Sequence, residues 1–199
     1  MQYLCDNFFS MTHRKLKIEE LGRISVEQYA NSDKLPLVIV LDNVRSQYNV
    51  GSIFRTSDAY RVSEIVLCGI CSQPPNVEIH KTALGAELSV PHRYFSKTTD
   101  AVKSLRNEGY TILAIEQAEQ SIQLQDFVPQ QDKKYAVILG HEVFGVQQDV
   151  IDLCDDCIEL PQFGTKHSLN VSVTAGIVIW DFSKQIRNHN TFLHSSLFL

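Results

Sequence analysis

Leu37-Val38-Ile39-Val40-Leu41 is a continuous apolar run rich in β-branched residues, and Asn49-Val50-Gly51-Ser52-Ile53-Phe54-Arg55 follows it after a short polar stretch. The run has the composition of a central strand in a parallel sheet, buried on both faces. The second segment predicts a helix over 50–60, with Asn49 as its N-cap. In α/β proteins, ligands bind where a strand ends and a helix begins. These two segments therefore predict an α/β fold with a ligand site after this strand.

The rest of the chain continues the alternation of strands and helices. Apolar runs predict strands at 65–68, 110–115, 135–139 and 157–160, and helical patterns predict helices at 16–31, 99–108, 147–154 and 168–186. Such alternation predicts a mostly parallel sheet with flanking helices. We divide the 199 residues into an N-terminal extension with one helix (1–34), one α/β domain (35–186) and a C-terminal tail (187–199).

The charge of the chain is unevenly distributed. The formal net charge is −5 at pH 7, and residues 116–159 hold ten acidic residues and two lysines, a balance of −8. The remainder carries sixteen basic against thirteen acidic residues, a balance of +3. A surface that faces nucleic-acid phosphates must therefore be local, and affinity for RNA should be modest and sensitive to salt. The obvious additional basic group, near the first predicted helix, is Arg14, Lys15, Lys17 and Arg23.

Targeting signals and membrane spans are not evident in the sequence. No apolar run approaches the ~20 residues that a membrane span needs. The segment Met1-Gln2-Tyr3-Leu4-Cys5-Asp6 has no basic region followed by an apolar stretch, so we expect a cytoplasmic protein. Residues 1–10 show no pattern, whereas a polar and basic run begins at Met11. We expect residues 1–10 to be dispensable, with Met11 as an alternative start.

The cysteines form two CxxC pairs, Cys68/Cys71 and Cys154/Cys157. Two such pairs form a zinc site when ~15–20 residues separate them, and the gap here is far longer. An odd number of cysteines, five, without a secretion signal also argues against a disulfide framework. We therefore interpret these residues as small buried thiols and expect no metal.

Two later segments also place polar residues where a strand meets a helix. Gly140-His141-Glu142 follows the predicted strand 135–139 but lacks the Lys-Ser/Thr of a P-loop and the spacing of a dinucleotide fingerprint. Glu142 could accept hydrogen bonds from a substrate, or it could cap the next helix. In Ser168-Leu169-Asn170, Ser168 is the predicted N-cap of an apolar, buried helix. Polar residues that open such a helix need partners or a ligand.

The first segment has two readings of its own. Gly51 permits close approach of backbone or ligand, and Arg55 lies one turn further along, so the segment could grip a phosphate or a ribose. Alternatively, Asn49 only caps the helix and Arg55 pairs with Asp58. Residue types alone favour this second reading, because caps are common.

Together, the three segments resemble the motifs of the SpoU (TrmH-like) family of RNA ribose 2′-O-methyltransferases, within the SPOUT superfamily. The resemblance runs from about Leu37 to Phe182, and the order and spacing of the motifs are highly specific. It implies a trefoil knot in the C-terminal half, a homodimer, and S-adenosylmethionine bound in the loops of the knot. One departure is the pair Val143-Phe144, which is bulkier and more apolar than the residues usual there.

The resemblance also implies roles for individual residues. Those that match the catalytic and substrate-holding positions are Asn49, Arg55, Glu142, Ser168 and Asn170. Those that match the cofactor pocket, largely through backbone groups, are Ile115, Gly140, Leu160, Ser168 and Leu169.

The resemblance implies an S-adenosylmethionine-dependent RNA 2′-O-methyltransferase that acts on structured RNA, and we expect tRNA slightly in preference to rRNA. One alternative is an RNA-binding protein of the same fold without catalysis, against which the presence of Arg55, Ser168 and Asn170 argues. A second alternative is a Rossmann-type oxidoreductase, which the spacing of strands and helices would equally suit. No strand is followed by GxGxxG, so this alternative is disfavoured.

Overall fold

The computed structural model describes residues 13–195, and from residue 188 onward it describes only the backbone of the last helix. Within these residues the chain forms a seven-stranded sheet of order β3-β2-β1-β6-β4-β7-β5, and every neighbouring pair of strands is parallel. The strands are β1 Leu35–Asp42, β2 Val62–Cys68, β3 His92–Phe95, β4 Tyr110–Ile115, β5 Ile122–Gln123, β6 Lys134–Leu139 and β7 Asp156–Glu159.

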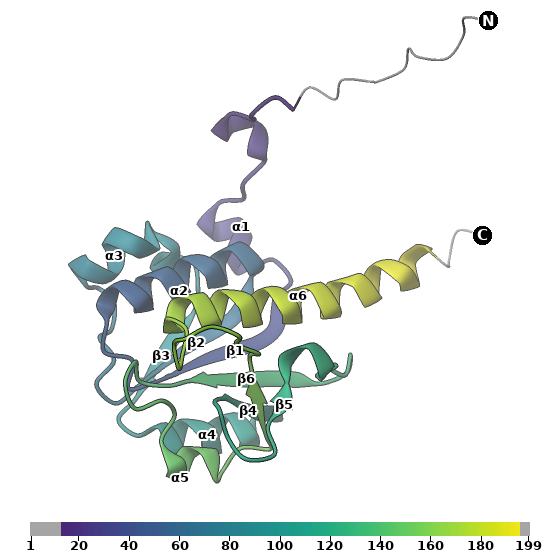
Figure 1. Ribbon diagram of the computed structural model, residues 1–199. Helices are drawn as coiled ribbons and strands as arrows, with labels where there is room; N and C mark the ends of the chain where they lie inside the picture. Colours follow the sequence, from purple (N-terminus) through teal and green to yellow (C-terminus); the bar gives the residue numbers. More distant parts are fainter. Residues whose placement is uncertain (1–12, 196–199) are drawn as a thin grey trace, which may run out of the picture.

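Helices cover both faces of the sheet (Figure 1). The longer helices are α2 Gln47–Tyr60, α3 Val77–Ala83, α4 Thr98–Asn107 and α6 Val171–Ser195. The short helices are α1 Val26–Ala30 and α5 Gln148–Ile151. The 3₁₀ turns are η1 Ile18–Leu21, η2 Ala86–Leu88 and η3 Leu124–Asp126. Figure 1 shows α2 and α6 on one face and α4 with α5 on the other. Such a double cover is typical of parallel sheets, whose crossover connections are helices.

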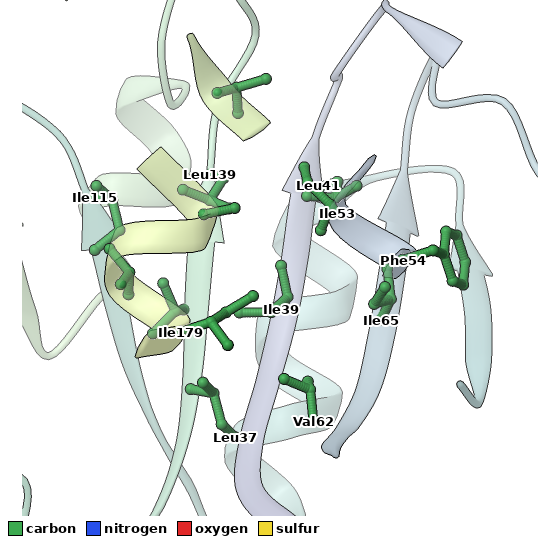
Figure 2. Packing of buried hydrophobic residues seen from close by; sticks show 14 of the residues in the cluster. Leu37, Ile39, Leu41, Ile53, Phe54, Val62, Ile65, Ile115, Leu139 and Ile179 are labelled. Carbon is green, nitrogen blue, oxygen red and sulfur yellow. The ribbon is translucent and has the colours of Figure 1, made fainter. Parts of the chain in front are cut away.

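Strand β1 shows why its sequence is apolar without interruption. Leu37, Ile39 and Leu41 belong to the core beneath α2 and α6, whereas Val38 and Val40 belong to the core on the side of α4 and α5. In Figure 2, Ile39 lies beside Ile179 of α6 and Leu41 lies beside Ile53 of α2. Full burial of one such side chain contributes ~1.5–3 kcal/mol, so both faces of β1 stabilise the fold.

Most of the predicted elements are confirmed. The predicted strands at 37–41, 65–68, 110–115 and 135–139 correspond to β1, β2, β4 and β6, the strand at 157–160 corresponds to β7, and the helix at 99–108 corresponds to α4. The helix predicted at 147–154 forms only as the short α5. The segment between β2 and α4 was not assigned, and it contains α3, η2 and the edge strand β3. The mostly parallel α/β class is thereby confirmed.

The prediction of one helix over 16–31 is wrong. The turn η1 ends at Gly22, which has a left-handed conformation (φ 58°), and a separate helix α1 begins after the N-cap Ser25. The apolar side chains from Leu16 to Val26 are exposed, and only Tyr29 of this segment is buried in the core. In Figure 1, the segment before α1 stands away from the sheet. Helical spacing was misleading here because these apolar side chains have no core to face.

The last helix also differs from the prediction of a buried helix over 168–186. It begins at Val171 and continues to Ser195. One of its faces packs on the sheet through Val178, Ile179 and Phe182, and another face is exposed. Despite its length, neither this helix nor any other in the described part of the chain is apolar enough to cross a membrane. Residues 1–10, expected to be dispensable, lie outside the described residues.

Candidate active site

A cavity of about 550 Å³ lies beyond the carboxyl ends of β4, β6 and β7. The loops that follow these strands and the start of α6 form its walls. The residues that line it are Ile115, Glu116, Gln117, Leu139, Gly140, His141, Glu142, Val143, Phe144, Gly145, Glu159, Leu160, Gln162, His167, Ser168, Leu169, Asn170, Val171 and Thr174. All five residues expected to bind a cofactor are among them, as are Glu142, Ser168 and Asn170 of the expected catalytic group. Asn49 and Arg55 are not.

The first segment forms the start of α2, but Asn49 is not its N-cap. Ser46 occupies that position, and its hydroxyl accepts a hydrogen bond from the backbone N–H of Asn49. Both residue types cap helices well, so the sequence did not show that the helix starts one turn earlier. This shift places the Asn49 side chain within the first turn, where it can face other segments.

Gly51 permits close approach of backbone and not of a ligand. A Cβ at this position would lie 2.3 Å from the backbone oxygen of Ile79 and 2.1 Å from Oγ1 of Thr82. Both residues belong to α3. The glycine therefore allows α3 to pack directly against α2, and it takes no part in the cavity.

Glu142 joins the second segment to the first. Its carboxylate accepts hydrogen bonds from the backbone N–H groups of Arg45 (3.0 Å) and Ser46 (2.9 Å), and from the Asn49 side-chain amide (3.0 Å). Burial alone would raise the pKa of Glu142, but these donated hydrogen bonds lower it below the ordinary value. Glu142 is therefore a carboxylate that holds the turn before α2 from a distant loop. It does not cap the helix that follows it in the sequence, α5.

Asn49 also contacts the third segment. Its Oδ1 accepts a hydrogen bond from Nδ2 of Asn170 at 3.2 Å, while its Nδ2 donates to Glu142. A chain of side-chain hydrogen bonds thus connects Glu142, Asn49 and Asn170, which come from three separate segments. The structure brings these three predicted residues together at one edge of the cavity.

Asn170, and not Ser168, caps the last helix. Its Oδ1 accepts hydrogen bonds from the backbone N–H (2.8 Å) and the hydroxyl (2.6 Å) of Ser172. Ser168 lies before the helix and lines the cavity. Asn170 therefore has partners in α2 and in its own helix, whereas Ser168 lines the cavity.

Arg55 lies on α2 with an exposed side chain. Among the residues that the structure describes it forms no salt bridge, so the predicted pairing with Asp58 is wrong. Asp58 instead accepts a hydrogen bond from the Ser89 hydroxyl. Arg55 does not line the cavity of its own chain.

Sequence reasoning missed Glu116, which shapes the cavity wall. Its carboxylate accepts hydrogen bonds from the backbone N–H groups of Gln117 and Val146, both at 2.9 Å. A Cβ at Gly145 (φ +67°) would lie 2.1 Å from this carboxylate, and one at Gly140 would lie 2.1 Å from the backbone of Gly145. The sequence did indicate that Glu116 could line the site, because this residue directly follows the predicted strand that ends at Ile115.

The four cysteines that the structure describes, Cys68, Cys71, Cys154 and Cys157, are free thiols. Cys68 and Cys71 are buried, and burial raises the pKa of Cys68 to about 12 and that of Cys71 to about 11. Among the described residues, His, Cys, Asp and Glu side chains form no cluster of three or more that could hold a metal ion.

The fold is that of a parallel α/β protein, and its cavity lies beyond the carboxyl ends of the strands, where proteins of this class bind ligands. Within that class, the chain belongs to the SpoU rRNA Methylase family, whose model matches residues 36–180. The resemblance seen in the sequence is thereby confirmed.

Named relatives support this assignment. The chain is 28% identical to the 23S rRNA (guanosine-2'-O-)-methyltransferase RlmB of Neisseria meningitidis over 155 residues, which cover 78% of the chain and 61% of that protein. It therefore spans about three fifths of the length of this relative. It is also 28% identical to the tRNA (guanosine(18)-2'-O)-methyltransferase of Thermus thermophilus, over 83% of the chain and 84% of that protein.

Solved structures show the same fold. The TrmH/SpoU tRNA modifying enzyme of A. aeolicus aligns with a TM-score of 0.73 at 21% identity, over 83% of this chain and 84% of that chain. An rRNA methyltransferase from Sinorhizobium meliloti, solved with AdoMet bound, aligns with a TM-score of 0.69 at 24% identity, over 76% of this chain and 60% of that chain.

Proposed function

We propose that the protein transfers the methyl group of S-adenosylmethionine to a ribose 2′-hydroxyl of structured RNA in the cytoplasm, with tRNA ahead of rRNA. The observation that carries the proposal is the cavity at the carboxyl ends of β4, β6 and β7, to which Asn49 is connected by hydrogen bonds through Glu142 and Asn170. The relatives named above act on ribose 2′-oxygens of rRNA and tRNA, which supports the reaction and leaves both RNA classes open to the test below.

The cavity fits the proposed cofactor in charge and in polarity. Ile115, Leu160 and Leu169 provide apolar walls suited to an adenine ring, and Gly140 and Ser168 provide backbone groups beside them. The charged side chains of the lining are the carboxylates of Glu116, Glu142 and Glu159, with no lysine or arginine among the lining residues. Such a surface favours a ligand with net positive charge, as S-adenosylmethionine has through its sulfonium and amino groups. Bound there, the cofactor would supply an electrophilic methyl group and need no metal.

The acceptor hydroxyl needs orientation and a route for its proton. The guanidinium group of an arginine donates hydrogen bonds and is a poor base, so Arg55 serves better to orient the hydroxyl and a substrate phosphate than to remove a proton itself. In this proposal the phosphate takes the proton. Ser168 and Asn170 hold the ribose, and the Glu142–Asn49 pair fixes the start of α2, on which Arg55 stands.

The position of Arg55 supports a homodimer. The side chain is exposed on α2 and does not line the cavity of its own chain. A second copy of the chain could bring its Arg55 to this cavity, so we propose that the active site forms between two subunits. The family also implies a trefoil knot in the C-terminal half, and we include it in the proposal.

The test begins with the cofactor. Isothermal titration calorimetry with S-adenosylmethionine and S-adenosylhomocysteine in the presence of EDTA should show binding, and a lack of heat with both would refute the proposal. Transfer of a radiolabelled methyl group to total RNA from cells without this gene then tests the activity. Profiling of ribose methylation across tRNA and rRNA, with and without the gene, identifies the substrate. A site in rRNA alone would overturn the preference for tRNA.

A further inference from the structure

The rim of the cavity carries an exposed aromatic residue. The side chain of Phe144 lines the cavity and is 81% exposed, and its neighbour Val143 is also exposed. A soluble protein gains nothing in stability from such exposure, and apolar side chains gathered at a polar site mark a binding surface. Phe144 belongs to the pair of residues that departs from the family pattern. Any role of Phe144 is therefore particular to this chain and is not one that the family pattern supplies.

The loop that carries Phe144 is held rigidly. His141 and Gly145 exchange two backbone hydrogen bonds, of 3.0 and 2.9 Å, so the loop closes as a tight turn. The backbone N–H of Val143 donates to Nδ1 of His141 at 3.0 Å, which fixes the orientation of the imidazole. The rings of His141 and Phe144 lie with their centroids 4.9 Å apart and their planes inclined by 35°. Together they form a platform that exists before a ligand arrives, and preorganisation lowers the entropic cost of binding.

The negative charge around the platform of His141 and Phe144 determines which kind of ligand can bind there. Glu116, Glu142 and Glu159 line the same cavity, and the platform lies within residues 116–159, where the charge balance is −8. A phosphate placed on the platform itself would be repelled by these carboxylates. A nucleobase has no net charge and offers a flat face, and stacking on aromatic side chains is a general way in which proteins bind unpaired bases.

We propose that Phe144, supported by His141, stacks on the base of the nucleotide whose ribose is methylated. The inference rests on the proposed function, and it specifies the substrate class: a nucleotide in a loop, a bulge or a single strand. Within a duplex both faces of a base are covered by its neighbours, so a paired nucleotide cannot reach the platform without being extruded.

Variants at one position separate stacking from simple apolar contact. Phe144→Leu keeps an apolar side chain of similar size without the ring, whereas Phe144→Tyr and Phe144→Trp keep a ring. We expect Phe144→Leu to lower kcat/KM for RNA by about 5- to 150-fold, mainly through KM, because stacking has that strength. The two aromatic variants should retain most of the activity. Leu88→Ala, at an exposed apolar residue of η2 outside the cavity lining, serves as the matched control and should behave as the wild type.

Two further measurements decide where the ring acts. Calorimetry with S-adenosylhomocysteine should give the same Kd for Phe144→Leu as for the wild type. The second measurement compares two forms of one RNA, which holds the mapped methylation site and its flanking sequence. In one form the site lies in a loop, and in the other it is annealed to a complementary strand. The annealed form should be the poorer substrate.

The outcomes distinguish this inference from the proposed function. If the wild type methylates RNA but Phe144→Leu does so equally well, the stacking role is wrong and the function stands. If Phe144→Leu weakens cofactor binding as much as it weakens RNA methylation, the ring belongs to the cofactor site. Equal rates on the loop and the annealed RNA would refute the substrate class. If the wild type transfers no methyl group to RNA, the proposed function fails and this inference fails with it.

Discussion

The amide of Asn170 donates a hydrogen bond to Oδ1 of Asn49 at 3.2 Å, although 121 positions separate the two residues. Asn170 also caps α6, because its Oδ1 accepts the backbone N–H of Ser172. The side-chain oxygen of Asn170 thus stabilises the start of α6, and its side-chain nitrogen connects this helix to Asn49. Substitutions can remove one of these contacts and keep the other.

We predict that Asn170→Asp and Asn170→Ala both reduce methyl transfer, but that only Asn170→Ala lowers the free energy of unfolding, by about 1 kcal/mol. Aspartate caps helices as well as asparagine does, but it has no N–H to give Asn49. Urea unfolding and methyl-transfer rates on the same preparations make the comparison. Full activity in Asn170→Asp would show that the contact with Asn49 has no role in the reaction.

Glu142 provides a prediction on pH. Its pKa is lowered in the folded protein, so its contribution to stability is complete above the ordinary carboxylate value of 4.5 and is lost as the pH falls through the lower folded value. Glu142→Gln cannot accept both backbone hydrogen bonds, because one carboxylate oxygen becomes an amide that donates. We expect a loss of about 1–2 kcal/mol in the free energy of unfolding at pH 7, allowing for the partial exposure of the group. The difference between the variant and the wild type should shrink below pH 4.5. A difference that stays constant from pH 7 to pH 3 would contradict this account.

Gly51 allows a prediction about packing alone. In Gly51→Ala the new methyl group would meet Ile79 and Thr82 of α3. We expect a loss of about 1–3 kcal/mol from overpacking, although alanine favours a helix more than glycine does. Ser52→Ala, at the next position of the same helix, is the control and should change the stability little. Chemical denaturation measures both variants. An increase in stability for Gly51→Ala would mean that α3 moves away without cost.

These predictions involve contacts that the sequence showed only in part. Runs such as Leu37–Leu41 determine the central strands because burial on two faces requires an uninterrupted apolar segment. The positions of the site segments followed from the ends of these strands, and the five residues expected to bind the cofactor do line one cavity. The family resemblance supplied their roles, which the geometry alone does not give.

What the sequence could not show depends on partners that are distant along the chain. Asn49 and Ser168 were expected to be caps, yet Ser46 and Asn170 hold those positions. Choosing between two good capping residues requires knowing which side chain has another partner, and Asn49 has Glu142. The helix expected over 16–31 failed for a related reason, because spacing does not reveal whether a core lies opposite.

Substitution of Arg55 should affect methyl transfer without affecting stability. Because its side chain is exposed on α2, Arg55→Ala should change the free energy of unfolding by less than about 0.5 kcal/mol. We expect it to reduce methyl transfer by at least about 100-fold, the usual effect of removing a positioned donor, and to leave the affinity for S-adenosylhomocysteine unchanged. Lys103→Ala, at an exposed basic residue of α4, is the matched control. Wild-type turnover in Arg55→Ala would refute the assignment of Arg55 to the ribose and phosphate.

The exposed face of α6 tests the proposed homodimer. Val173 (50% exposed), Ile177 (39%) and Trp180 (54%) lie at intervals of four and three residues, so they form one stripe along the helix. Inside a monomer this stripe stays in contact with water, whereas a two-fold contact with the same stripe of a second chain would bury it on both subunits. The C-terminal tail could cover it instead, but the side chains from residue 188 onward lie outside those that the structure describes.

We predict that Ile177→Asp shifts the protein from dimer to monomer in sedimentation equilibrium at micromolar concentration. The charge would be buried against an apolar surface without a partner, which costs far more than a surface substitution does. Leu88→Asp, at an exposed apolar residue of η2, should leave the dimer intact and serves as the control. Because Arg55 is proposed to act in the cavity of the other subunit, the monomeric variant should lose methyl transfer.

Mixing Arg55→Ala with an inactive variant of the cofactor loop, Gly140→Ala, should restore part of the activity, because one of the two sites in the mixed dimer is then complete. A wild-type chain that is monomeric and fully active would refute both the dimer and the role of Arg55 across it.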